Sequence, residues 1–234
     1  MEDAPHNLFM SAFSSLSDIA SASILLSEIG RGRTEASNDL RRMLVTAVEN
    51  GEDVDISSTL GLLEKESAQG NTSAMVYLGI ACARGIGMVK DETRAANLYK
   101  RAADDGDADG QYHLAVAYAY GTGVPVQKEH ALDLLRSAAE NGQPDAQSII
   151  GVAYSDGSFG LTKDMPRAIE LWKKAAAMGN TEAQCNIGTA YAKGEYVDAD
   201  PEYALTMWTM AAQSGNPTAQ CNLATAYMQG SGVE

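Results

Sequence analysis

Glycines recur at a nearly constant interval along this chain. Gly70, Gly106, Gly142, Gly179 and Gly215 are separated by 36, 36, 37 and 36 residues. The segments between them are similar in sequence: AQCNIGTAYAKG, residues 183–194, returns as AQCNLATAYMQG, residues 219–230. A period of about 20 to 50 residues is typical of solenoid proteins, in which each repeat packs on its neighbours. The spacing therefore predicts a stack of similar units.

The first half of each unit predicts a helix, here called helix A. Small and apolar residues recur at steps of three and four, as in Ala183, Ile187, Ala190 and Tyr191. Each such segment ends at a glycine, which can adopt the left-handed conformation that closes a helix. The closing glycines are Gly85, Gly121, Gly157, Gly194 and Gly230.

The second half predicts another helix, helix B. An aspartate suited to N-capping stands near its start in three repeats: Asp91, Asp164 and Asp200. Pro201 then occupies a first helical position, where a missing N–H is tolerated. The apolar stripe of one such helix is Ala168, Leu171, Trp172 and Ala175.

Small residues at fixed places predict close helix packing. Helices of about 14 residues are marginal alone in water, so they depend on their neighbours. The residue after Leu or Ile on helix A is always small: Gly79, Ala115, Gly151, Gly188 and Ala224. Helix B carries alanine pairs: Ala102–Ala103, Ala138–Ala139, Ala175–Ala176 and Ala211–Ala212. These positions predict helix crossings at short distance.

The pattern A-x-x-x-L-G-x-x-Y-x-x-G-x-G-V, followed by D-x-x-x-A-x-x-L/Y-x-x-A-A-x-x-G, resembles the Sel-one-like repeat family, a relative of the tetratricopeptide repeat. The resemblance implies an all-α fold, a right-handed α-α superhelical solenoid of helix pairs. It covers residues 70–234, as four repeats and a partial fifth: 70–105, 106–141, 142–178, 179–214 and 215–234. The third repeat has an inserted residue in GSFGLTKD, and the fourth has Gly194-Glu195-Tyr196 in place of Gly-x-Gly. We expect those two loops to differ in shape.

The pattern decays toward both ends. Residues 34–69 contain LRRMLVTAVENG and TLGLLEKESAQG, which predict degenerate capping helices. Residues 1–33 predict an amphipathic helix and a hinge, and the apolar stripe is Phe9, Phe13, Leu16, Ile19 or Ala20, and Ile24. This helix either lies on the first repeat or serves docking and self-association, and the segment around Thr34 is a hinge or a phosphorylation target. At Glu234 a helix B is due, so we expect either a longer chain or a terminal helix A that acts as the cap.

Composition excludes several classes of function. The chain has 31 acidic and 17 basic residues, a net charge of -14, which disfavours nucleic acid and anionic membranes as ligands. No apolar run approaches the roughly 20 residues of a transmembrane helix, and no secretory signal opens the chain. Three cysteines do not make a disulfide framework, so we expect a cytoplasmic protein. A periplasmic or lumenal protein whose signal had been removed would show the same features.

Residue types suited to catalysis do not gather into a motif. His6, His113 and His130 form no zinc-ligand spacing, and no phosphate-binding loop or nucleophile–histidine pattern is present. We therefore expect no metal, no cofactor and no enzymatic activity. Cys185 and Cys221 occupy equivalent positions on neighbouring helices about 8 to 10 Å apart, beyond the reach of a disulfide, which predicts free thiols.

Helix A also predicts a partner-binding groove on the inner curve of the solenoid. Its positions are Val76, Ile80 and Arg84; Tyr112, Val116 and Tyr120; Ser148, Val152 and Asp156; Cys185, Thr189 and Lys193; Cys221, Thr225 and Gln229. Asn186 and Asn222 flank this stripe. In the tetratricopeptide family, residues at these places hold extended peptides and asparagines pair with the peptide backbone. The alternative is that the cysteines only pack and the asparagines are solvated.

Two functions follow from the resemblance. The first is a non-catalytic protein–protein interaction scaffold or adaptor that binds a peptide or partner segment in the groove. The second is a regulatory or targeting module of a larger signalling enzyme or multiprotein complex. The identity of the protein partner is not encoded in any recognisable motif.

Overall fold

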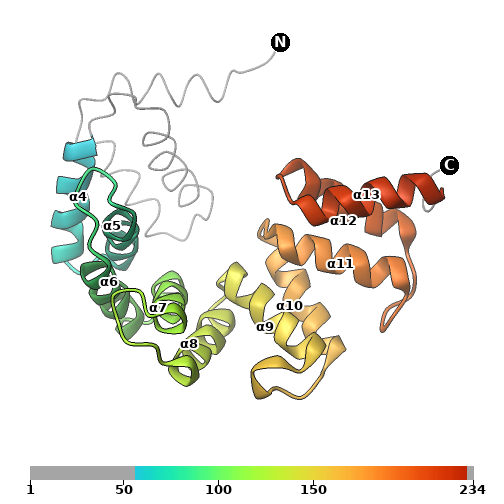
Figure 1. Ribbon diagram of the computed structural model, residues 1–234, viewed down its shortest axis with the longest axis horizontal. Helices are drawn as coiled ribbons and strands as arrows, with labels where there is room; N and C mark the ends of the chain where they lie inside the picture. Colours follow the sequence, from blue (N-terminus) through green and yellow to red (C-terminus); the bar gives the residue numbers. More distant parts are fainter. Residues whose placement is uncertain (1–55, 231–234) are drawn as a thin grey trace, which may run out of the picture. The chain divides into compact units, whose positions relative to one another are not determined.

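The computed structural model describes residues 56–230, which fall into two compact units divided within helix α8, after Ala131. Over these residues the secondary structure is entirely helical, which confirms the all-α class (Figure 1). The first unit contains α4 Ile56–Ala68, α5 Thr72–Arg84, α6 Glu92–Asp104 and α7 Ala108–Tyr120. Helix α8 spans Lys128–Glu140. The second unit contains α9 Pro144–Asp156, the 3₁₀ turn η1 Ser158–Gly160, α10 Met165–Ala177, α11 Thr181–Lys193, α12 Pro201–Gln213 and α13 Pro217–Gln229.

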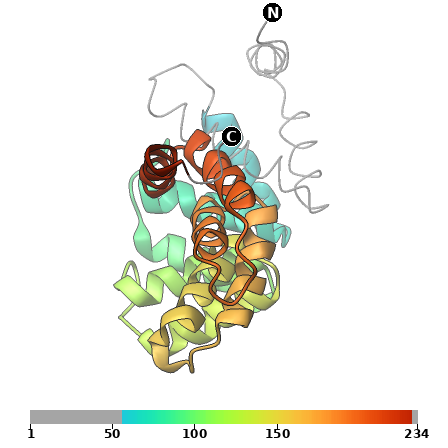
Figure 2. The ribbon, with the colours of Figure 1, turned by 90° about the vertical axis from the view of Figure 1, so that its right-hand side faces the viewer.

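The helices alternate as the repeat predicts. Helices α5, α7, α9, α11 and α13 are helix A of successive repeats, and α6, α8, α10 and α12 are helix B. In the second unit α11, α12 and α13 lie side by side in both views (Figures 1 and 2). Helix α4, in the segment expected to cap the stack, packs on α5. The amphipathic segment 1–33, the segment around Thr34 and the first capping helix lie outside the described residues.

Local sequence sets the helix ends. The carboxylates of Asp91, Asp164 and Asp200 accept hydrogen bonds from backbone N–H groups of the first turn of α6, α10 and α12, as predicted. Helix A is capped in the same way by side-chain oxygens of Asn71, Asp107, Gln143, Asn180 and Asn216. Each helix A ends at its predicted glycine in the left-handed conformation, with φ from 65° to 77°.

Three of the predicted small residues lie directly beneath an aromatic ring of their own helix B. A Cβ added at Gly188 would lie 2.6 Å from Cδ1 and from Nε1 of Trp208. Gly151 has the same relation to Trp172, at 2.5 Å, and Gly79 to Tyr99, at 2.5 Å. Such distances leave no space for a methyl group, so the prediction of close crossings is confirmed at these sites.

The indole N–H groups complete the same contacts. Trp208 Nε1 donates to the carbonyl oxygen of Cys185 at 3.2 Å, and Trp172 Nε1 donates to that of Ser148 at 3.3 Å. In both repeats the acceptor lies three residues before the small residue. The ring can approach this carbonyl only because the residue one turn later has no side chain.

A row of glutamines joins consecutive repeats in the second unit. Gln147 Nε2 donates to Ala139 O at 3.1 Å, and Gln184 Nε2 donates to Ala176 O at 3.3 Å. These carbonyls belong to the last turn of the preceding helix B, and each also accepts a hydrogen bond from the backbone N–H of the glycine after that helix, Gly142 or Gly179. The sequence has a glutamine at this place in four repeats, but the repeat pattern alone does not show which group that glutamine binds.

The two irregular loops do differ from the rest. Phe159 in η1 has φ 54°, and Tyr196 has φ 66° at the place where other repeats have the second glycine of Gly-x-Gly. A side chain in this left-handed region is strained. Gly123 stands at this place in the second repeat, and a Cβ there would overlap the carbonyl oxygen of Glu92.

Candidate partner-binding surface

The predicted groove positions of the first unit lie on α5 and α7 and differ widely in exposure. Val76 and Ile80 are core residues, with 3% and 6% of their surface exposed. Tyr112 and Val116 are half-buried. Arg84 is exposed, and Tyr120 is 78% exposed. The accessible part of this stripe is therefore aromatic at α7 and cationic at the end of α5.

The groove positions of the second unit lie on α9, α11 and α13. Ser148 and Cys185 are buried, with 4% and 5% exposed. The half-buried positions are Asn186, Thr189 and Asn222, and the exposed ones are Val152, Asp156, Lys193, Cys221, Thr225 and Gln229. A partner of this surface would contact polar side chains mainly.

The Cys-Asn pair links two neighbouring A helices. Asn222 Nδ2 on α13 donates to Cys185 Sγ on α11, with a separation of 3.6 Å. The hydroxyls of Thr189 and Thr225 turn inward to their own helices and donate to Cys185 O and Cys221 O, both at 2.9 Å. Three of the hydrogen-bond donors of this surface, on Thr189, Asn222 and Thr225, therefore already donate to groups within the protein.

The two buried thiols, Cys82 and Cys185, are not arranged for nucleophilic chemistry. Cys82, Cys185 and Cys221 are all free. Burial raises the pKa of the Cys82 thiol and of the Cys185 thiol, and the hydrogen bond from Asn222 opposes this shift at Cys185. A raised pKa keeps the thiol protonated and unreactive near neutral pH.

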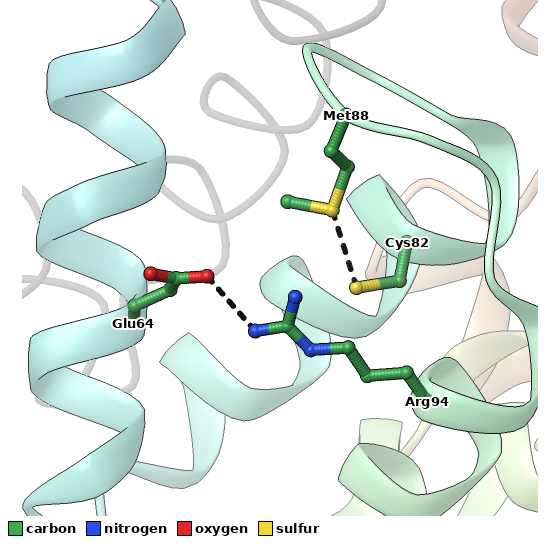
Figure 3. A network of polar contacts seen from close by, with 4 residues as sticks. All are labelled: Glu64, Cys82, Met88 and Arg94. Atoms are coloured by element: carbon green, nitrogen blue, oxygen red, sulfur yellow. Dashed lines mark hydrogen bonds and ion pairs between the residues drawn. The ribbon is translucent and has the colours of Figure 1, made fainter.

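Cys82 lies in a small polar network between the first helices of the first unit (Figure 3). Its Sγ is 3.4 Å from Met88 Sδ, while Arg94 Nη2 donates to Glu64 Oε1 at 2.8 Å. The ion pair joins α4 to α6, and both of its side chains are about half exposed. We read this network as a structural tie of α4 and not as a catalytic site.

Other ligand chemistry has little support in the described part of the chain. Between residues 56 and 230, no group of three or more His, Cys, Asp or Glu side chains is placed to hold a metal ion. Over the same residues, no helix has both the length and the apolar character that a membrane crossing needs.

Charge is distributed unevenly over the second unit. The last basic residue of the sequence is Lys193, and the 41 residues from 194 to 234 carry five carboxylates and no Lys or Arg. Four of these acids precede or open α12: Glu195, Asp198, Asp200 and Glu202. This part of the unit is therefore strongly acidic.

Consecutive helices form repeated pairs that share their N-caps, their closing glycines and their small residues at helix crossings. These features define a helical-repeat protein built from helix pairs. The family model described as Sel1 repeat matches residues 72–107, 108–143, 144–180, 181–216 and 217–234. The chain belongs to the Sel1 repeat family. Sel1 repeats are in general protein–protein interaction modules, and their fold is in general a non-catalytic scaffold.

Solved structures agree with this assignment. A Sel1 repeat protein from Oxalobacter formigenes is 29% identical, with a TM-score of 0.66 over 82% of this chain and 76% of that one. A protective antigen present in uropathogenic Escherichia coli strains, which displays the same repeat fold, is 30% identical with a TM-score of 0.63. That match covers 91% of this chain but 45% of the antigen. The immunity protein PA5088 from Pseudomonas aeruginosa, 22% identical, shares the fold with a TM-score of 0.53 over 78% of this chain and 66% of its own. Comparison with curated proteins gives no match.

Proposed function

We propose that this protein is a scaffold or adaptor whose helix A surface holds a peptide or partner segment. The observation that carries the proposal is the alignment of accessible polar side chains on successive A helices of the second unit. Asn186 and Asn222 occupy the same place in consecutive repeats and are half-buried, and the Asn222 amide is oriented by its hydrogen bond to Cys185 Sγ. An ordered amide suits recognition of a peptide backbone, because it offers both a donor and an acceptor.

The first unit would contribute a different kind of contact. Tyr112, Val116 and Tyr120 supply an apolar and aromatic surface on α7. Tyrosine is enriched at protein interfaces because it buries a large ring and retains a polar end. A ligand of the first unit would accordingly use an apolar anchor, whereas a ligand of the second unit would be bound through its backbone. The free thiols favour a reducing compartment, such as the cytoplasm, as the place of action.

The test removes the two amides and measures partner capture. Tagged protein, its Asn186→Ala/Asn222→Ala variant and an Asn97→Ala control are used as baits in lysate from the native cell, followed by quantitative mass spectrometry. Asn97 is an exposed residue on α6, a helix B, and is not one of the residues of the proposed surface. Loss of two hydrogen bonds of about 0.5 to 1.5 kcal/mol each predicts an affinity loss of roughly 5- to 150-fold. Melting temperatures are measured for all three proteins. Equal capture by all three would contradict the proposed surface.

A second candidate function is a regulatory or targeting module of a larger signalling enzyme or complex. It is favoured by one observation, that the chain spans less than half of the similar Escherichia coli antigen. The complete reading frame distinguishes the two functions. A catalytic domain encoded in the same frame would support the module, and its absence would support the adaptor.

A further inference from the structure

The two irregular loops of the second unit each carry an exposed aromatic side chain. Phe159, in the loop after α9, is 57% exposed, and Tyr196, in the loop after α11, is 69% exposed. Among residues 56–230 they are the only residues other than glycine that have a positive φ. In the first unit, Gly87 and Gly123 hold the position of Tyr196, with φ 65° and 73°. Residues held in such a strained conformation cluster at functional sites.

The fold does not use either of these rings. Within the described residues, neither ring stacks on another ring or on a cation, and the Tyr196 hydroxyl makes no hydrogen bond. Neither residue belongs to the hydrophobic clusters around Trp172 and Trp208. The loop after α11 contacts the core through Val197 instead, which is partly buried against the cluster of α10 and α11. Aromatic side chains that the core does not need, held on loops, are suited to recognition of a partner.

Both loops are fixed where they join the next helix. The backbone N–H of Asp164 donates to Tyr154 O at 2.8 Å, and that of Asp200 donates to Tyr191 O at 3.0 Å. Helix α10 packs on both α9 and α11, and the two loops lie at the same edge of the second unit in both views (Figures 1 and 2). We call these loops, residues 157–164 and 194–200, the loop edge. Preorganised loops lower the entropy that is lost when a partner binds.

Charge indicates which partner suits the loop edge. Its residues include four carboxylates and one lysine. Two of the acids, Glu195 and Asp198, are exposed and form no hydrogen bond or ion pair with any other residue that the structure describes. A second copy of this chain, with a net charge of -14, or an anionic membrane would be repelled, whereas a cationic segment would be attracted. Arginine suits the site better than lysine, because its planar guanidinium both pairs with carboxylates and stacks on aromatic rings.

We propose that the loop edge binds an arginine-rich segment of a partner protein. The rings of Phe159 and Tyr196 stack with guanidinium groups of this segment, and Glu195 and Asp198 pair with them. None of these four residues belongs to the helix A surface proposed above, so the loop edge is a separate place of contact.

The test compares two peptides of equal charge on the full chain. Labelled Ac-(Gly-Ser-Arg)₄-amide and Ac-(Gly-Ser-Lys)₄-amide are titrated, and binding is followed by fluorescence anisotropy. Phe159→Gly/Tyr196→Gly removes both rings and leaves glycine, which accepts a positive φ, so this variant should fold. The control is Met178→Ala, which removes an apolar side chain that is 41% exposed and lies just after α10, outside the loop edge. Melting temperatures show that each variant is folded.

The wild-type chain should bind the arginine peptide more tightly than the lysine peptide. Loss of two exposed cation–π contacts predicts that Phe159→Gly/Tyr196→Gly binds the arginine peptide about five- to thirtyfold more weakly. The loss for the lysine peptide should be smaller. Met178→Ala should bind both peptides as the wild-type chain does.

A second pair of variants tests the carboxylates. Glu195→Gln/Asp198→Asn should weaken the binding of both peptides, and added salt should reduce the difference from wild type. Glu140→Gln/Glu182→Gln makes the same change in net charge at exposed positions on α8 and α11, outside the loop edge. This control should weaken binding less.

Four results would overturn the proposal. The first is that the wild-type chain does not bind the arginine peptide, and the second is that removal of both rings leaves its affinity unchanged. Equal losses in the two acid-pair variants would show that net charge alone attracts the peptide. Finally, a wild-type dimer in sedimentation, or wild-type binding to phosphatidylcholine vesicles, that is lost with both rings would make a second copy or a membrane the occupant. None of these results bears on Asn186 and Asn222, so the proposed adaptor function is tested separately.

Discussion

The substitution Gly188→Ala tests the packing on which the repeat depends. The added Cβ would lie 2.6 Å from two ring atoms of Trp208 and 3.1 Å from the carbonyl oxygen of Ala204. The ring is 8% exposed and donates to Cys185 O, so it cannot shift without loss of that hydrogen bond. Overpacking costs about 1 to 3 kcal/mol and a hydrogen bond about 0.5 to 1.5 kcal/mol.

A gain in helix propensity opposes these costs. Alanine is favoured over glycine within a helix by about 1 kcal/mol. The expected net loss is therefore between about 0.5 and 3.5 kcal/mol, and Gly188→Leu should cost more. For a chain of this size each kcal/mol corresponds to about 2 to 4 °C in melting temperature.

Thermal unfolding followed by circular dichroism at 222 nm measures the effect. Gly61→Ala is the matched control, because Gly61 lies within α4 and an added Cβ would meet nothing within 4 Å. That control should melt at or above the wild-type temperature. Adding Trp208→Leu to Gly188→Ala recreates the residue combination of the second repeat, whose sequence has Ala115 and Leu135 at the equivalent positions. A double-mutant cycle should then show that the two changes cost less together than separately. If Gly188→Ala stabilised the protein as much as Gly61→Ala does, the argument that the Trp208 ring leaves no space for a Cβ at residue 188 would be refuted.

Three further predictions concern single side chains. Tyr196→Gly should raise the free energy of unfolding by up to about 1 kcal/mol, because it relieves a positive φ at a residue that is 69% exposed; an unchanged or lower melting temperature would count against strain there. Gln184→Met places the methionine that the first repeat has at the same position, Met75. It should change the free energy of unfolding by less than about 1 kcal/mol, because it removes both a hydrogen bond and a buried amide oxygen that has no partner. Chemical denaturation measures this change, and a loss above about 2 kcal/mol would point to an ordered water on that oxygen. Because the pKa of the Cys185 thiol is raised in the folded protein, the unfolded chain loses this proton at a lower pH. The contribution of Cys185 to stability is therefore full below the ordinary thiol pKa of 9.0 and is lost as pH rises through the folded-state pKa. Cys185→Ala should lessen this fall in denaturation curves measured from neutral to alkaline pH, and an equal fall in the variant would contradict the raised pKa.

The sequence predicted those parts of the fold that local chemistry determines. Helix ends could be placed because an aspartate cap or a left-handed glycine, such as Asp200 or Gly194, acts within a few residues of itself. The positions of helix crossings could be predicted because a recurrent small residue within a helix, such as Gly188, indicates that another helix packs closely there. The periodicity repeated each of these signals three to five times, so a departure such as Tyr196 was visible as one.

The candidate surface was harder to predict because burial depends on neighbouring helices. Assigning a stripe by helical spacing alone grouped Val152, which is exposed, with Ser148, which is buried one turn earlier. Cys185 is covered because α12 crosses it and because Asn222 reaches it from the next repeat. Periodicity gives the side of a helix, whereas the depth of a side chain also depends on how far the adjacent helices extend over it.

Within each unit, the contacts between helices join elements that are adjacent or nearly adjacent along the chain, as α11 with α12 and α5 with α7. The sequence separation between contacting residues is therefore short, and such low contact order is associated with fast folding. Little loop-closure entropy is spent before each contact forms. The same helix pair can then be duplicated or deleted during evolution, because a new pair must match only the neighbours it meets.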